Sequence, residues 1–182
     1  MPLNQAKDLI KSISADENII TSHIGNINLN HSIVVADPSF PIDIYTNVIL
    51  ENLMPGNYHC LITEKEFGEG YGLRVTNLII IHQDAAITNI ATLIDEVSVD
   101  GGVAGIFDLE YFEHAHLPEV NDEWHNSQIR NPLWRSGQYK NFNVTENQGV
   151  LTISGFGDGS YPLYVHLNDN NQIDAVRVCF IP

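Results

Sequence analysis

The spacing of apolar and polar residues changes early in the chain, from the period of a helix to the period of a strand. Ala6, Leu9, Ile10 and Ile13 recur at intervals of three and four, which predicts an amphipathic helix within a helical lead-in over residues 1–17. Beyond this segment the apolar runs are short, rich in β-branched residues and separated by Pro, Gly, Asn and Asp. The change of period predicts a β-rich chain with a helical N-terminal segment.

Eight apolar runs have the length and composition of β-strands. They cover Asn18–Ile24, Ser32–Ala36, Tyr45–Leu50, Asn57–Thr63, Leu73–His82, Val150–Ser154, Tyr161–Leu167 and Ile173–Phe180. The last three are separated by the turn sequences GFGDGS and NDNN, so we expect them to form one antiparallel meander. Its alternating residues predict core positions at Val150, Leu163, Val165, Val176 and Val178.

The segments between these runs are less regular. Residues 84–94 fit either a helix or a strand, because both periods match their apolar residues. Asp108 precedes a short helical pattern and is placed to cap it. Residues 117–137 contain two prolines and two tryptophans without a regular period, which predicts a surface loop packed in part by Trp124 and Trp134.

These elements predict an α+β, β-rich fold, with a mainly antiparallel twisted sheet or sandwich and two or three short helices. A length of 182 residues and a hydrophobic fraction of 43% fit a single domain over residues 1–182 with a substantial core. Cys60 and Cys179 lie in strand-like runs and are interpreted as buried, reduced thiols. The first residues carry charges where a signal peptide has an apolar run, so we expect a cytoplasmic protein.

Charge is the property in which this sequence differs most from an average protein. The chain has 8 Lys and Arg against 23 Asp and Glu, a formal net charge of −15. Such a chain repels nucleic acid and anionic membranes, because each phosphate contact needs a cation. No Lys or Arg occurs between Arg74 and Arg130, where ten acidic residues do. A field of one sign can steer a basic protein partner, and aromatic side chains in the same region can anchor it.

We therefore expect a partner-binding surface over residues 95–123, together with Trp124, which follows directly in the chain. Its predicted members are Asp95, Glu96, Glu110, Tyr111, Glu113, Glu119, Asp122, Glu123 and Trp124. The alternative interpretation of the same residues is a solvated acidic face without a partner.

A second hypothesis is a metal-dependent hydrolase or small-ligand enzyme. Its candidate ligands lie at strand ends, turns and one His-x-His pair: Asp37, Asp100, Asp108, Asp158, His114 and His116. The histidine spacing matches no strong zinc signature, and aspartate also favours turns and caps for structural reasons. The sequence GFGDG precedes a strand-like segment rather than a helix, so we interpret it as a tight turn and not as a phosphate loop. We therefore assign no catalytic residue, metal or cofactor.

Five segments occur in a recognisable order: VVADP, PGNYHC, LRVTNLII, VDGGVAGIFD and SGFGDGSYPLYVHLNDNNQIDAVRVCF. From about Ile33 to Phe180 the chain resembles a bacterial family catalogued as domain of unknown function 4241. The resemblance implies a shared β-rich fold over residues 33–180 and no established activity. The resemblance also implies that seven residues belong to the family pattern: Asp37, Asp100, Asp108, Gly157, Asp158, Gly159 and Tyr161. It does not distinguish a structural role from a chemical one for these residues.

The favoured hypothesis is an acidic, non-catalytic protein-binding module, in its most specific form a cytoplasmic immunity or antitoxin protein. Such a protein would neutralise a basic bacterial toxin such as a nuclease, whose cationic cleft an inhibitor can fill by mimicking a polyanion. The enzyme with clustered Asp and His is the alternative, and a structural or oligomer-forming domain is the second alternative. No nucleic acid, membrane or cofactor is expected, and the oligomeric state stays open.

Overall fold

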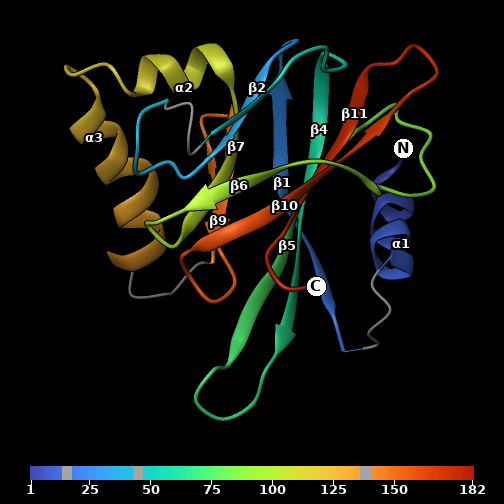
Figure 1. Cartoon of the computed structure of the whole chain (residues 1–182), viewed down its shortest axis with the longest axis horizontal. Coiled ribbons are helices and arrows are strands. Elements are labelled where there is room, and N and C mark those ends of the chain that lie inside the picture. The colour runs from blue at the N-terminus through green and yellow to red at the C-terminus, as the bar shows by residue number, and fades with distance from the viewer. Residues whose placement is uncertain (14–17, 43–46, 136–140) are drawn as a thin grey trace.

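Two antiparallel sheets pack face to face as a sandwich, with helices on both outer sides (Figure 1). This computed structural model describes residues 1–13, 18–42, 47–135 and 141–182. The six-stranded sheet has the order β1 (Ile20–Leu29), β4 (Gly56–Glu66), β5 (Leu73–His82), β11 (Ile173–Cys179), β10 (Gly159–Leu167) and β6 (Thr92–Val99). The five-stranded sheet has the order β3 (Val48–Leu50), β2 (Ile33–Ala36), β7 (Val103–Asp108), β9 (Gly149–Ile153) and β8 (Phe142–Thr145). The fold is therefore the predicted β-rich α+β class.

The helices form two separate outer layers. The first is α1 (Leu3–Ile13), which lies on the outer face of the six-stranded sheet. The second layer covers the five-stranded sheet and consists of α2 (Leu109–Ala115), α3 (Asn121–His125) and the π-helical segment η1 (Asn126–Arg135). Figure 1 shows the two helical layers on opposite sides of the molecule. The order of layers is helix, sheet, sheet, helix.

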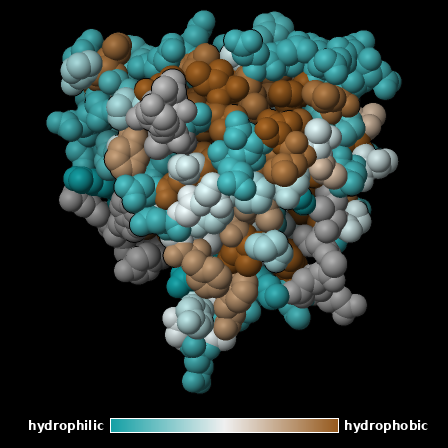
Figure 2. All heavy atoms as spheres, in the orientation of Figure 1, coloured by the Kyte–Doolittle hydropathy of each residue, from teal (hydrophilic) through white to brown (hydrophobic). Residues whose placement is uncertain are grey.

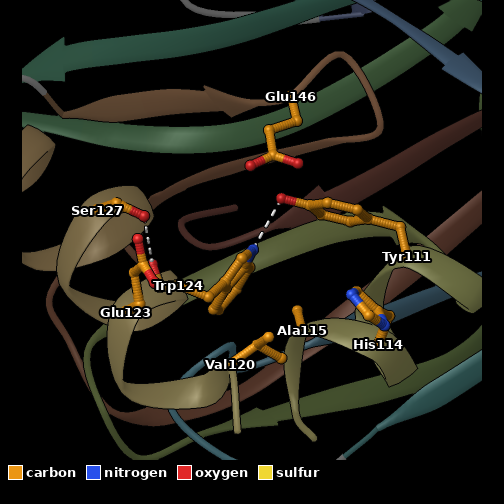
Figure 3. A pocket seen from close by; sticks show the side chains of 8 residues that line it. All are labelled: Tyr111, His114, Ala115, Val120, Glu123, Trp124, Ser127 and Glu146. Atoms are coloured by element: carbon orange, nitrogen blue, oxygen red, sulfur yellow. Dashed lines mark hydrogen bonds between the residues drawn. The ribbon is translucent and has the colours of Figure 1, made fainter.

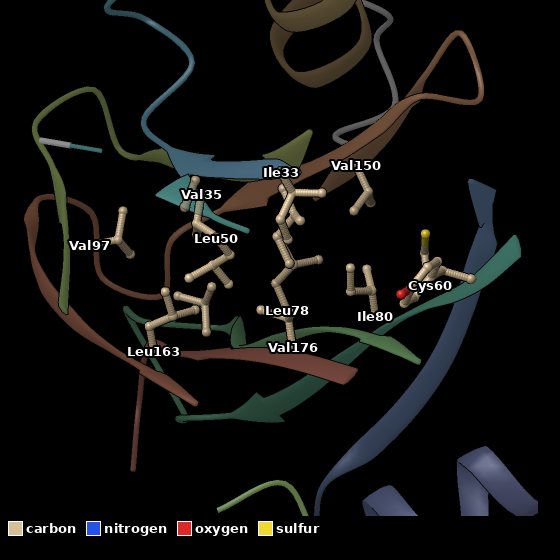
Figure 4. Packing of buried hydrophobic residues seen from close by; sticks show 14 of the residues in the cluster. Ile33, Val35, Leu50, Cys60, Leu78, Ile80, Val97, Val150, Leu163 and Val176 are labelled. Atoms are coloured by element: carbon tan, nitrogen blue, oxygen red, sulfur yellow. The ribbon is translucent and has the colours of Figure 1, made fainter. Parts of the chain in front are cut away.

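The main core fills the space between the two sheets (Figure 4). Leu78 and Ile80 on β5 point into it, whereas Ile79 and Ile81 pack under α1 on the other face of the sheet. Because successive strand residues point to opposite faces and both faces are covered, β5 needs an unbroken apolar run. The five predicted core positions, Val150, Leu163, Val165, Val176 and Val178, all belong to this core.

The predicted C-terminal meander is wrong in one respect. β10 and β11 pair with each other, but β9 pairs with β7 and β8 in the opposite sheet. The connection between β9 and β10 therefore carries the chain across the sandwich instead of closing a hairpin. The sequence pattern identifies the three strands, but it does not tell a hairpin turn from a crossing.

Two irregular regions also differ from the prediction. Residues 117–137 are not a loop, because α3 and η1 occupy Asn121–Arg135; the side chain of Trp134 lies outside the described residues. Over 84–94, neither a helix nor a strand forms before β6 begins at Thr92, although Ile87 and Ile90 are buried near α1. Tertiary packing of single apolar residues, not a repeating period, orders that segment.

The remaining boundaries agree closely with the predicted ones. The helical lead-in is confirmed over Leu3–Ile13, and residues 14–17 lie outside the described ranges. The predicted strand Tyr45–Leu50 is present from Val48, and its residues before 47 are also outside those ranges. Cys60 and Cys179 are both free and buried. No helix in the described part of the chain is long and apolar enough to cross a membrane.

Candidate protein-binding site

The candidate site begins where β7 ends and α2 starts, at Asp108. Its Oδ1 accepts the backbone N–H of Tyr111 at 3.4 Å, and its Oδ2 accepts the backbone N–H of Asn30 at 3.0 Å. An aspartate at this position satisfies an amide that the first helical turn leaves unpaired. The predicted cap is confirmed, and the buried carboxylate is engaged by backbone amides on both oxygens.

The ring of Phe107 lies under the helices of this layer, and we call it the aromatic floor. A Cβ atom on Gly105 would lie 2.3 Å from Phe107 Cζ, and one on Gly149 would lie 2.3 Å from Phe107 Cδ1. Only glycine therefore leaves room for the Phe107 ring to lie across β7 and β9. From this position the ring packs against Phe112 and Trp124, with centroid distances of 5.0 and 6.0 Å.

A pocket of about 210 Å³ opens beside this floor, and we call it the Trp124 pocket (Figure 3). It is lined by residues of α2, α3, η1 and the β8–β9 turn: Tyr111, His114, Ala115, Val120, Glu123, Trp124, Ser127 and Glu146. Trp124 Nε1–H donates a hydrogen bond to the Tyr111 hydroxyl at 2.7 Å. This bond fixes two aromatic side chains from different helices as one wall of the pocket.

Carboxylates border the same pocket from two elements. Glu123 comes from α3, and Glu146 comes from the β8–β9 turn, where Glu146 and Asn147 have φ of 47° and 62°. Two successive left-handed residues form the tight turn that suits a short hairpin. Figure 3 shows the Glu146 carboxylate facing the Tyr111 hydroxyl. Negative charge and aromatic surface therefore meet at one opening.

Burial and charge both act on Tyr111. Burial is the larger cause that raises the pKa of its phenol above 10.0, the charge of Glu146 adds to it, and the Trp124 hydrogen bond opposes it. The hydroxyl therefore stays protonated at neutral pH. Burial also lowers the pKa of nearby His125 below 6.5, helped by the charges of Arg130 and His116 and opposed by Asp37 and Asp122. The positive charge that His125 could contribute to this layer is thereby reduced.

All seven predicted acidic members of the partner-binding surface are exposed, but they belong to two layers. Glu110 and Glu113 lie on α2, Asp122 and Glu123 on α3, and Glu119 between the two helices. We call these five residues the acidic surface. Asp95 and Glu96 lie instead on β6, an edge strand of the six-stranded sheet.

The two predicted aromatic members do not project into solvent. Tyr111 is 8% exposed and Trp124 is 7% exposed, and both pack in the core beneath the helices. Both line the pocket, so they offer a recessed wall to a partner rather than a protruding anchor. The sequence prediction omitted Glu146 from this site. The turn-forming sequence after the strand FNVT was its only local signal, and the approach of that turn to α2 and α3 is a tertiary contact.

Two of the four aspartates of the metal hypothesis accept hydrogen bonds from backbone amides. Asp37 is buried and accepts backbone N–H groups from Ser39, Asp100 and Gly101 at 2.9, 2.9 and 2.5 Å. Asp108 caps α2, whereas the side chains of Asp100 and Asp158 are exposed. These contacts give Asp37 and Asp108 structural roles.

The two histidines of that hypothesis also have separate surroundings. His114 is exposed and lines the Trp124 pocket. The ring nitrogens of His116 lie 2.9 and 3.3 Å from the backbone carbonyl oxygens of Phe112 and Pro38. Across the described ranges, no three His, Cys, Asp or Glu side chains are grouped so as to hold a metal ion.

The GFGDG segment forms a tight turn that leads into β10, so no helix N-terminus follows it. Gly155 and Gly157 have φ of +48° and +112°, which glycine tolerates best. The hydroxyls of Ser154 and Tyr161 donate to the Gly157 carbonyl oxygen at 2.7 and 2.6 Å. The turn interpretation is confirmed, and Tyr161 is one of the side chains that hold it.

Comparison with known proteins identifies the family but no activity. No curated protein and no solved structure matches the chain. One family model does match, over residues 30–178 of 182, and it describes a protein of unknown function (DUF4241). The match begins just before β2 and ends within β11, so it includes the helices of the Trp124 pocket and every strand except β1. The chain belongs to the DUF4241 family.

Proposed function

We propose that this protein is a non-catalytic binding module that captures a basic protein partner through the acidic surface and the Trp124 pocket. The observation that carries the proposal is the pocket itself, where Glu123 and Glu146 border the aromatic wall of Tyr111 and Trp124. A Lys or Arg side chain gains from both parts of such a site, because its cation pairs with carboxylates and also stacks on aromatic faces.

The acidic surface around the pocket supports the same partner chemistry. Its five carboxylates are exposed on one helical layer, and no Lys or Arg occurs in the sequence between Arg74 and Arg130. Individual exposed charges contribute little affinity, but their summed field speeds the encounter with an oppositely charged protein. The surface would steer the partner, and the pocket would hold one of its basic side chains.

The most specific form of the proposal is a cytoplasmic bacterial immunity or antitoxin protein. A toxin that acts on nucleic acid needs a cationic cleft to bind phosphates, and an acidic inhibitor can block that cleft without a catalytic group. The hydrolase alternative has less support, since Asp37 and Asp108 are used by backbone amides. A cognate toxin encoded directly upstream would favour the immunity form.

The test is a comparison of two charge-reversed proteins. The partner is captured from the source cell on immobilised parent protein at low salt, and its association is then followed by stopped flow. The test protein carries Glu110→Lys, Glu113→Lys, Glu119→Lys and Glu123→Lys. The control carries the same number of reversals at exposed acids elsewhere: Glu51→Lys, Glu69→Lys, Asp84→Lys and Asp169→Lys. Both proteins therefore have the same net charge.

We expect the association rate constant at low salt to fall at least about tenfold in the test protein and much less in the control. The salt dependence of the rate should flatten in the test protein, because the steering field is what salt screens. An equal fall in both proteins would mean that net charge alone matters. A test protein that associates like the parent would identify the acidic surface as solvated surface only.

A further inference from the structure

The GFGDG turn faces a second pocket, which the proposed binding of a basic protein does not use. Phe156 on this turn packs edge to face against two aromatic residues at the end of the β4–β5 hairpin, Phe67 at 5.2 Å and Tyr71 at 5.8 Å between ring centroids. Figure 1 shows this hairpin extending away from the body of the protein. In Figure 2, apolar atoms reach the surface where the hairpin leaves the body.

Two of these aromatic side chains are exposed although their backbone is well held. Phe156 is 57% exposed and Tyr71 is 61% exposed, and neither belongs to a hydrophobic core of the protein. The bonds from Ser154 and Tyr161 to the Gly157 carbonyl hold the turn in a shape that keeps Phe156 outward. An exposed aromatic side chain on a turn held in this way gains little for folding, but it binds a partner at low cost in conformational entropy.

Arg74 supplies the polar part of this pocket. Its side chain lines the pocket, and its Nε atom is buried without a hydrogen-bond partner. In the described part of the chain no carboxylate pairs with Arg74, although the sequence has 23 acidic residues. Arg74 is the basic residue that lines this pocket, so it is the group with which an anionic ligand would pair.

The size of the pocket suits a small ligand. Its volume is about 640 Å³, within the range of small-molecule sites, and Tyr71, Arg74 and Phe156 line it with Ile153 and five glycines. A Cβ atom placed on Gly70 or Gly157 would meet no other atom within 4 Å, so the backbone there is open to a ligand. We call this site the glycine-turn pocket.

We propose that the glycine-turn pocket binds a small ligand that combines an aromatic or other apolar group with a single carboxylate. The carboxylate pairs with the Arg74 guanidinium, whose planar fork matches it in two hydrogen bonds. The apolar group packs on Tyr71 and Phe156. A ligand of several negative charges is disfavoured by the net charge of −15, whereas a monoanion needs only the one cation.

The test uses 3-phenylpropionate as the probe and its neutral amide, 3-phenylpropionamide, as the matched compound. Binding to the full chain is followed by isothermal titration and by amide chemical shifts. We expect the carboxylate to bind with a dissociation constant of about 1 mM or tighter, and the amide about tenfold more weakly. The shifted amides should belong to the β4–β5 hairpin end and the β9–β10 turn.

Two variants and their controls assign the binding to the pocket. Arg74→Gln should weaken the carboxylate about tenfold and abolish its advantage over the amide. Arg177→Gln removes the same charge at Arg177, which stacks on Tyr164 away from the pocket, and should bind like the parent. Phe156→Ala should weaken both compounds, whereas Phe40→Ala, at another exposed phenylalanine, should weaken neither.

Three results would overturn the proposal: no binding by the parent, equal affinity for acid and amide, or an unchanged affinity in Arg74→Gln. Arg74→Gln and Phe156→Ala alter partly or largely exposed side chains, and their circular dichroism and melting temperature verify the fold. Because the probe carries no basic group, a failure here leaves capture of a basic protein by the acidic surface unaffected. Loss of that capture would likewise leave the glycine-turn pocket unaffected.

Discussion

The two sheets of this protein are covered by helical layers of very different chemistry. On the six-stranded sheet, α1 buries Ala6 and Ile10 against aliphatic side chains such as Leu61, Ile79 and Ile81. On the five-stranded sheet, the cover contains stacked aromatic rings, a buried hydrogen bond and a pocket bordered by carboxylates. Both layers solve the same problem, which is to remove one apolar face of a sheet from water.

The difference shows that the layer on the five-stranded sheet has features that are not needed to stabilise the fold. The outer face of the six-stranded sheet is covered by α1 together with buried aliphatic residues such as Ile87 and Ile90, and α1 contains no aromatic residue. The cover of the other sheet buries tyrosine and tryptophan polar atoms, which must be matched by partners, and it surrounds them with five exposed acids. The proposed binding function rests on these features, and α1 provides an internal reference for testing it.

The largest effect should come from removing the aromatic floor. Phe107→Ala should lower the free energy of unfolding by about 4 kcal/mol, and Ile10→Ala under α1 by about 3 kcal/mol, because each leaves a cavity in a dry core. Denaturation in urea measures both. Under conditions where each variant is still folded, only Phe107→Ala should lose partner capture. Loss of capture in Ile10→Ala as well would remove the functional distinction between the layers.

A smaller effect should follow from breaking the buried hydrogen bond alone. Trp124→Phe removes the donor to Tyr111 and should cost about 1–2 kcal/mol, since the buried hydroxyl loses its partner. Ser12→Ala removes a bond from Ser12 Oγ to the Leu9 carbonyl at the exposed end of α1, and should cost less than about 0.5 kcal/mol. A double variant with Tyr111→Phe should show that the Trp124 and Tyr111 effects are coupled. Fully additive effects would contradict the geometry of this pair.

The smallest effect should be a local response to pH in the layer of α2, α3 and η1. The pKa of His125 is lower in the folded protein than its ordinary 6.5, mainly through burial, so the unfolded segment takes up the proton first as pH falls. The stability from this group is therefore present above about pH 6.5 and is lost below it. Hydrogen exchange of α3, corrected for its intrinsic pH dependence, should therefore be faster at pH 5.5 than at pH 7.5.

His125→Gln is the control for that measurement, because glutamine does not titrate. The variant should show no such acceleration in α3, and exchange in α1 should respond to pH as in the parent. An identical pH response in the parent and in His125→Gln would assign the effect to other groups.

The elements with a strong local pattern were predictable from the sequence. The long runs of β4 and β5 are confirmed because both of their faces are buried, and the Asp108 cap is confirmed because capping is a contact within one helical turn. The segment that became α3 and η1 was not predictable in the same way. Its two tryptophans and its proline hide the helical period, and the π-helical geometry widens the turn around Pro132.

The candidate site was predictable as a list of acidic residues with Tyr111 and Trp124, but not as a pocket. Exposure of Glu110, Glu113 and Glu123 follows from their place on short helices with one buried face. The position of Glu146 at the same pocket as Glu123 does not follow, because it depends on how the β8–β9 turn approaches α3. The recessed position of Trp124 is also a tertiary result, set by the Phe107 ring and the glycines beneath it.

The pairing of β5 with β11 sets the order in which this molecule can be completed during synthesis. β5 ends at His82, but the strand that joins its second edge begins only at Ile173. Until that strand leaves the ribosome, β5 presents open amide and carbonyl groups along one of the most apolar segments of the chain. Completion of the six-stranded sheet is therefore a late event, and until then the open edge of β5 is exposed to pairing with other chains.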